Sequence, residues 1–238
     1  TGVQTCALPI YPSKPIRFVI PFPPGGGTDT NSRAVMQRVA KNTGWTVVMD
    51  NKPGAGGNVG AAEAARAAPD GYTLVMGQTS NLAINPFLYA KMPFDPLKDF
   101  EPVALVSAVP LVVLASAKSH YKTLADVVAV AKAAPERVTF ASPGNGTVGH
   151  LSGELIARLA GVKLLHVPYK GLAPALTDLI GGRVDLYLST PQAAVGQIKG
   201  GTVRALAVTS VRRVATLPQV PTLAEADLAA AEVVSWYG

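Results

Sequence analysis

Residues 19–29 read Val-Ile-Pro-Phe-Pro-Pro-Gly-Gly-Gly-Thr-Asp, and this stretch indicates how the chain folds. Its β-branched start is typical of a buried strand, its prolines and glycines of a loop, and Thr28 or Asp29 can serve as the N-cap of a following helix. Three glycines allow a tight turn that brings main-chain N–H groups close to a ligand, and the positive end of a helix dipole favours an anion there. The stretch therefore predicts an anion-binding loop, which we call the first cradle (residues 25–29).

A second stretch of the same kind lies far downstream. Residues 138–141 read as a strand, residues 142–147 (Ser-Pro-Gly-Asn-Gly-Thr) as a loop, and residues 148–160 as a helix. We call residues 142–147 the second cradle. One glycine turn between a strand and a helix is common in α/β folds and often binds nothing, but two in one chain favour ligand binding. If they belong to two lobes, they can face each other across a cleft and hold one small anion.

The composition fits a folded protein of this size. A chain of 238 residues can form one large or two small domains, and 48% hydrophobic with 15% charged residues argues against disorder. The net charge of +6 is scattered along the sequence, so no nucleic-acid-binding stripe is expected. The excess of basic residues fits a weak attraction for small anions, although a solvated surface is the simpler explanation. Cys6 is the single cysteine, which excludes an internal disulfide.

Alternating strand and helix patterns predict two α/β lobes. Strands are expected at residues 16–20, 46–49 and 72–76 with helices between them, which implies right-handed crossovers and a parallel sheet. The pattern breaks near residue 100, and an apolar connection leads to a second series of strands and helices. We therefore expect two lobes, each a mainly parallel sheet flanked by helices.

The lobe boundaries follow from where the pattern breaks. We expect residues 11–101 to form the first lobe, continued by residues 222–238, and residues 102–221 to form the second lobe with the hinge strands. Residues 1–10 lack the basic start and apolar core of a signal peptide, so we interpret them as a non-native leader. Three strands without a closing helix leave apolar sheet surface uncovered, so we expect the C-terminal part of the first lobe to be missing.

Three further polar residues are candidates for ligand contact. Ser80 and Asn81 follow the third strand, at the carboxyl edge where open α/β sheets bind ligands, but helix capping explains them as well. His150 lies in the first turn of the helix behind the second cradle. It can donate a hydrogen bond to a ligand oxygen, or it can cap or pack.

The sequence offers little support for an enzyme. Gly144-x-Gly146-x-x-Gly149 has the form of a dinucleotide-binding loop, but the next strand ends without the acidic residue that binds the ribose. Neither cradle is followed by Gly-Lys-Ser or Gly-Lys-Thr, no nucleophile elbow is present, and the three histidines are too scattered for a zinc site. We expect no catalytic residue, metal or cofactor. An α/β enzyme with a nucleotide at the Gly144 loop remains the alternative of a different class.

Several motifs together resemble one protein family. Residues 21–29 with Arg33, and residues 51–60 (Asn-Lys-Pro-Gly-Ala-Gly-Gly-Asn-Val-Gly), are similar to two signatures of the Bug-type (TctC) solute receptors of tripartite tricarboxylate transporters. Further matching motifs follow in the expected order at residues 70–74, 99–100, 144–147 with His150, 166–171, and 217–222 with Glu225. The resemblance runs from about residue 11 to residue 238.

The resemblance implies a two-lobed periplasmic binding protein of the type II-like, venus-flytrap kind, which closes on a small carboxylate. In such receptors the two cradles hold the carboxylate through main-chain N–H groups and bound water. By position, the resemblance assigns ligand binding to Gly26, Gly27, Thr28, Asp29, Ser142, Gly144, Gly146, Thr147 and His150. Asp185 is assigned to the distal end of the ligand.

We therefore expect a periplasmic, monomeric receptor that binds a carboxylate without chemistry and delivers it to integral membrane permease subunits. Delivery to a membrane sensor instead of a permease is an open alternative. No Arg or Lys lies inside either cradle, which argues against a guanidinium clamp. Main-chain donors recognise a carboxylate without indicating what it is attached to, so a di- or tricarboxylate, an acidic amino acid and an aromatic acid all remain open.

Overall fold

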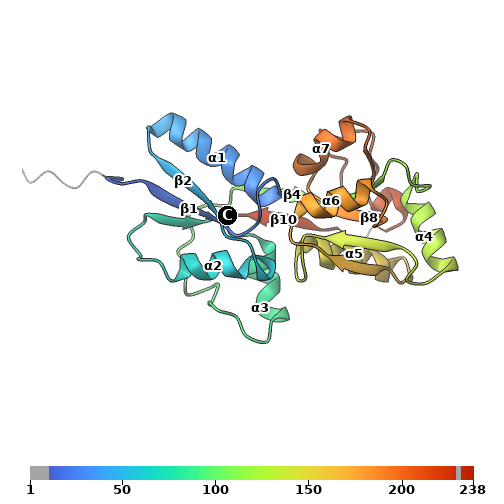
Figure 1. The fold of residues 1–238 in the computed structure, drawn as a ribbon, viewed down its shortest axis with the longest axis horizontal. Coiled ribbons are helices and arrows are strands. Elements are labelled where there is room, and N and C mark those ends of the chain that lie inside the picture. The colour runs from blue at the N-terminus through green and yellow to red at the C-terminus, as the bar shows by residue number, and fades with distance from the viewer. Residues whose placement is uncertain (1–10, 229–231) are drawn as a thin grey trace, which may run out of the picture.

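A computed structural model describes residues 11–228 and 232–238. Two α/β lobes lie side by side along its long axis, the first on the left and the second on the right of Figure 1. The leader expected at residues 1–10 and part of the expected C-terminal continuation of the first lobe, residues 229–231, lie outside the described residues. None of the helices in the two described ranges has the length and apolar character that crossing a bilayer requires.

The first lobe is built on the strand that precedes the first cradle. This strand, β1 (Ile16–Ile20), lies between β2 (Val47–Asn51) and β3 (Thr73–Val75) in a parallel three-stranded sheet of order β2-β1-β3. As predicted from its apolar run, β1 is almost wholly buried. Helices α1 (Gly27–Thr43) and α2 (Asn58–Ala65) lie above and below the strands in Figure 1.

The start of α1 differs from the prediction. Its N-cap is Gly26, which has no side chain to cap the helix, and neither Thr28 nor Asp29 occupies that position. Gly44 at the other end adopts the left-handed conformation expected of a C-cap, with φ of 73°. The predicted helix is therefore present, but its N-terminal N–H groups carry no side-chain cap.

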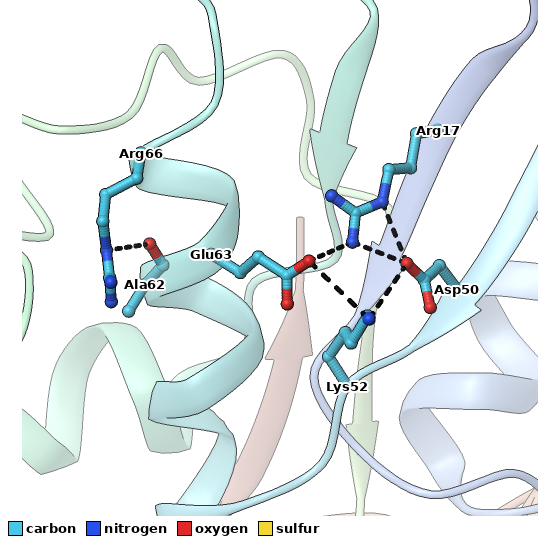
Figure 2. A network of polar contacts seen from close by, with 6 residues as sticks. All are labelled: Arg17, Asp50, Lys52, Ala62, Glu63 and Arg66. Carbon is cyan, nitrogen blue, oxygen red and sulfur yellow. Dashed lines mark hydrogen bonds and ion pairs between the residues drawn. The ribbon is translucent and has the colours of Figure 1, made fainter.

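An ion-pair network ties α2 to the sheet of the first lobe (Figure 2). Arg17 of β1 donates from Nε and Nη2 to Asp50 of β2, at 2.9 and 2.6 Å, and from Nη2 to Glu63 of α2. Lys52 Nζ lies 3.7 Å from both carboxylates. The network fixes α2 over the edge formed by β1 and β2.

Three short elements, one before α2 and two after β3, close one side of the first lobe. They are the short 3-10 turn η1 (Ala55–Gly57) before α2, the π-helical turn η2 (Thr79–Ile84) and α3 (Asn85–Leu88). Asn85 is fully buried and its Nδ2 donates to Gly56 O at 3.2 Å and to Asn58 Oδ1 at 2.8 Å. These bonds hold η1, α2 and α3 together.

The second lobe contains a five-stranded mixed sheet of order β7-β6-β8-β5-β9. Strand β5 is antiparallel to both of its neighbours, and β6 is parallel to β7 and β8. The five strands are β5 (Val112–Ser116), β6 (Thr139–Ser142), β7 (Leu165–Pro168), β8 (Leu186–Ser189) and β9 (Val203–Val208).

Four helices cover the two faces of this sheet. Helices α4 (Leu124–Ala133) and α5 (Val148–Leu159) pack on one face, around Phe140. Helices α6 (Leu172–Ile180) and α7 (Pro191–Lys199) pack on the other, around Tyr187. The α/β class with mixed sheets and flanking helices agrees with the sequence prediction.

The lobes are joined by an antiparallel strand pair. The apolar connection near residue 110 forms β4 (Ser107–Pro110), and β4 pairs with β10 (Val234–Tyr237). Val109 and Tyr237 pack against the core of the first lobe, whereas β5 begins two residues after Pro110 in the second. Leu223, before β10, packs in the second lobe, and the turn η3 (Ala224–Ala226) follows it.

Candidate functional site

The first cradle is held in place by the side chain of Asp29. Its Oδ2 accepts from Gly25 N–H at 2.9 Å, and its Oδ1 accepts from Arg33 Nε at 2.9 Å and from Asn51 Nδ2 at 3.0 Å. Burial alone would raise the pKa of Asp29, but these hydrogen bonds outweigh burial and hold the pKa below its ordinary value. Asp29 is therefore an ionised, buried anchor for the loop.

The second cradle is shaped by Thr147 and two glycines. Thr147 is the N-cap of α5: its Oγ1 accepts from His150 N–H at 3.4 Å and donates to Gly144 O at 2.7 Å. Gly144 and Gly146 adopt φ of 142° and 74°, and residues other than glycine rarely adopt these backbone conformations. The loop thus turns sharply into the positively polarised start of α5.

Two imidazoles support the second cradle from behind. His150 and His166 stack with their ring centroids 4.0 Å apart. His150 Nδ1 accepts from Gly146 N–H at 3.3 Å, and His166 Nε2 lies 2.7 Å from Ser142 Oγ. Burial lowers the pKa of both, that of His166 to about 4 with a further contribution from His150, so both rings are neutral near pH 7.

The two cradles border one cavity of about 70 Å³ between the lobes. The predicted residues that line it are Gly26, Gly27, Thr28, Ser80 and Thr147. The residues that sequence reasoning did not select are Phe22, Pro23, Gln78, Leu111, Pro143, Val148, Gly149, Gly171, Leu172, Tyr187, Leu188, Ser189, Thr190, Ser235 and Tyr237. Among the described residues, those around the cavity include no Asp, Glu, Lys, Arg or His.

Ser80 links the two lobes beside this cavity. Its Oγ, on η2 of the first lobe, accepts from Val148 N–H in the first turn of α5 at 3.1 Å. Asn81 has the capping role that was the alternative for it: its Oδ1 accepts from Gln78 N–H at 3.0 Å at the start of η2. Ser80 is therefore at the cavity and Asn81 supports the turn that carries it.

Several predicted ligand-binding residues support the cradles and do not line the cavity. They are Asp29, Asn81, Ser142, Gly144, Gly146 and His150. Ser142 illustrates this position: its Oγ accepts from Gly144 N–H at 3.2 Å and lies 3.0 Å from Gly144 O, within the loop itself. These residues fix the main-chain path that the lining residues follow.

The prediction for Asp185 is wrong. Its Oδ2 accepts from Thr139 N–H and from Thr139 Oγ1, both at 2.8 Å. Thr139 begins β6 and Ser142 ends it, and β8 runs parallel to β6. Asp185 immediately precedes β8, so it lies at the edge of the sheet opposite the second cradle.

Some of the cavity-lining residues that the sequence analysis did not select follow a recognisable sequence pattern. Ser189 and Thr190 end β8 and are followed by Pro191, the first residue of α7, which is a strand-to-helix junction at the same sheet edge as the second cradle. Tyr237 had none, because it reaches the cavity only through the pairing of β10 with β4. Within the described ranges, no group of His, Cys, Asp and Glu side chains is arranged to hold a metal ion.

Comparison with known proteins decides the family. A family model described as the tripartite tricarboxylate transporter family receptor (TctC) matches residues 32–238. This chain belongs to the TctC receptor family. The resemblance seen in the sequence motifs is thereby confirmed, and the family is one of solute receptors and not of enzymes.

Curated relatives of this TctC receptor include Bug proteins. It is 40% identical over 232 residues to a UPF0065 protein in the tcbD-tcbE intergenic region of Pseudomonas sp. strain P51, covering 97% of this chain and 69% of the relative. It is 39% identical to protein BugT of Bordetella pertussis, covering 90% of this chain and 66% of BugT. The chain thus spans about two thirds of the length of these relatives.

Solved structures of the family share the fold. A Rhodopseudomonas palustris protein with adipate superposes with a TM-score of 0.92 at 35% identity, covering 95% of this chain and 76% of that protein. MatC of the same organism, with bound malate, gives a TM-score of 0.89 at 34% identity, covering 96% and 78%. Further neighbours of this TctC receptor are a periplasmic transporter structure and the periplasmic binding protein BugD.

Proposed function

We propose that this chain is the ligand-binding part of a receptor that captures one small carboxylate between its two lobes. The observation that carries the proposal is the single cavity bordered by the N-terminal turns of both α1 and α5. Helix N-termini present N–H groups and a positive potential, and so favour an anion. Because no cationic side chain of residues 11–228 and 232–238 borders the cavity, we assign the recognition of the ligand to main-chain donors.

The ligand's oxygens are received by N–H groups from both lobes. In the first cradle these belong to Gly27 and Thr28, where α1 has no side-chain cap. In the second they belong to the start of α5 at Gly149, since the Val148 N–H is already bonded to Ser80 Oγ. Asp29 and the residues behind the second cradle keep both loops in the binding geometry.

Two structural neighbours support a carboxylate as the ligand class, since one was solved with adipate and the other with malate. For this chain we extend the class to di- and tricarboxylates, acidic amino acids and aromatic acids. The cavity is lined by tyrosine, leucine and neutral hydroxyl side chains, which can surround the remainder of any of these ligands beyond the carboxylate.

Isothermal titration calorimetry tests this function directly. Malate, adipate, citrate, glutamate and benzoate are titrated into the protein, each beside its uncharged amide as a matched control. We expect at least one acid to bind with a micromolar dissociation constant while its amide does not bind. A folded protein that binds no acid up to millimolar concentration contradicts the proposal.

We further propose that the receptor acts in the periplasm as a monomer and delivers its ligand to integral membrane permease subunits. Membership of the transporter receptor family supports this. Uptake of the bound carboxylate is measured in cells with and without the receptor gene. Loss of uptake supports delivery to a permease, whereas intact uptake with loss of a ligand-induced transcript favours a membrane sensor. Light scattering of the purified protein checks the monomeric state.

A further inference from the structure

Thr190 is an N-cap residue whose side chain does not cap its helix. It precedes α7, yet no side-chain hydrogen bond to the first turn of α7 is formed. The N-cap threonines of α4 and α5 behave differently: Thr123 accepts from Asp126 N–H and Thr147 accepts from His150 N–H. A threonine before a helix ordinarily accepts such a bond. The Thr190 hydroxyl is therefore directed away from the helix that it precedes.

This hydroxyl is also buried without a partner. Thr190 is only 6% exposed, and its Oγ1 has no hydrogen-bond partner among the described residues. Buried polar side chains are usually hydrogen-bonded, and leaving one unpaired is unfavourable. Because Thr190 borders the cavity, a bound molecule can supply the missing partner.

The position of Thr190 indicates which part of a ligand it would meet. Its Oγ1 and Cγ2 each lie 2.8 Å from the point where a Cβ on Gly27 would stand, and Tyr237 OH lies 2.9 Å from the same point. Gly27 begins α1, where the proposed function places the carboxylate. Thr190 thus adjoins the proposed carboxylate site, so it can meet a group on the carbon next to the carboxylate.

We propose that Thr190 determines specificity for 2-hydroxycarboxylates by hydrogen bonding to the ligand's 2-hydroxyl group. A hydroxyl both donates and accepts, so it matches the Thr190 hydroxyl in either direction. A 2-amino group is charged and needs an anionic partner, and the residues around the cavity include no acidic side chain within the described part of the chain. This inference rests on the proposed capture of a carboxylate between α1 and α5.

Matched pairs of acids that differ by one 2-hydroxyl test the inference. Malate with succinate, lactate with propionate, and mandelate with phenylacetate are titrated into the wild type, Thr190→Val and Thr190→Ser. We expect the wild type to prefer the hydroxylated member of the pair that fits the cavity. Thr190→Val should weaken that member about tenfold and leave its partner within about twofold, since one hydrogen bond is lost. Thr190→Ser, which keeps the hydroxyl, should bind almost as the wild type does.

A control variant separates specificity from stability. Thr190→Val should melt at the wild-type temperature because the hydroxyl makes no bond within the protein, and Thr190→Ala replaces it if the valine variant does not fold. Thr123→Val removes a true cap far from the cavity, so it should lower the melting temperature and leave affinity unchanged. The inference is overturned if Thr190→Val weakens both members of a pair equally or neither of them, or if carboxylates bind without preference for a 2-hydroxyl. A wild type that binds no carboxylate overturns the proposed function itself, and the inference with it.

Discussion

At the scale of single residues, the second cradle depends on the neutral ring of His166. Its pKa of about 4 lies below the ordinary value of 6.5 because the ring is buried and lies against His150. In the unfolded chain His166 takes up a proton near pH 6.5, whereas in the fold it does so only near pH 4. The stability that this difference contributes is therefore fully present above pH 6.5 and is lost as the pH falls from there toward about 4.

We predict that His166→Gln flattens this part of the pH dependence of stability. The glutamine amide can still hydrogen-bond to Ser142 Oγ, but it does not titrate. Urea unfolding measured across this pH range should show a smaller loss for the variant than for the wild type. His120→Gln, which replaces an exposed histidine outside both cradles, is the control for the substitution itself. Equal slopes for wild type and His166→Gln would contradict the account.

Individual residues also show what the sequence could and could not predict. Gly26, Gly27, Thr28 and Thr147 line the cavity, and the sequence could point to them because a strand, a glycine loop and a helix start form a local pattern. Asp185 was assigned to the ligand from the family resemblance, but it immediately precedes β8 and so lies at the sheet edge opposite the second cradle. Thr190 meets Gly27 only through the packing of one lobe on the other, and Tyr237 meets it only through the pairing of β10 with β4, and no local pattern contains either contact.

At the scale of elements, α5 is fitted to its sheet by a glycine. A Cβ on Gly153 would overlap the ring of Phe140, which is fully buried and cannot move aside. We predict that Gly153→Ala lowers the free energy of unfolding by about 1–3 kcal/mol, despite the better helix propensity of alanine.

Gly196 in α7 provides the matched control, because nothing lies within 4 Å of the position of its Cβ. Gly196→Ala should raise the free energy of unfolding by about 0.5–1 kcal/mol. Urea unfolding of both variants measures the difference. Changes of the same sign in the two variants would show that contact with Phe140 does not decide the effect.

The ion-pair network of Figure 2 leads to a second prediction, on how α2 is held to the sheet. Arg17 is two-thirds covered and binds two carboxylates, one on β2 and one on α2. Arg17→Met should lower the free energy of unfolding by about 1 kcal/mol, since it leaves Asp50 and Glu63 with only the more distant Lys52 Nζ as a shared cation in this network. Lys14→Met breaks the exposed pair with Asp70 and should destabilise the protein less than Arg17→Met does. Thermal unfolding compares them, and equal losses would argue against a structural role for the network.

At the scale of the whole molecule, the lobes meet where a glycine of one faces a side chain of the other. Gly27 faces Thr190, Gly146 faces Asn85, and Gly171 faces Pro23. The missing side chains let the lobes approach closely around the cavity. Closure of the lobes therefore depends on these glycines as well as on the ligand.

Gly27→Ala separates closure from folding. The alanine suits the first turn of α1, but its Cβ would lie 2.8 Å from the Thr190 side chain. We predict an unchanged melting temperature and a loss of carboxylate affinity of roughly tenfold or more, from a steric cost of about 1–3 kcal/mol in the closed form. Calorimetry gives the affinity, and small-angle scattering should find the variant more extended than the wild type at saturating ligand. Undiminished affinity would show that close contact at Gly27 is not needed.

The central claim is that main-chain N–H groups from both lobes hold one carboxylate. A crystal structure of the protein with a carboxylate identified by calorimetry tests it most directly. The account predicts the carboxylate oxygens between the N-terminal turn of α1, at Gly27 and Thr28, and that of α5, at Gly149. A ligand bound outside this cavity, or one whose carboxylate is paired with an arginine or lysine side chain, would contradict it.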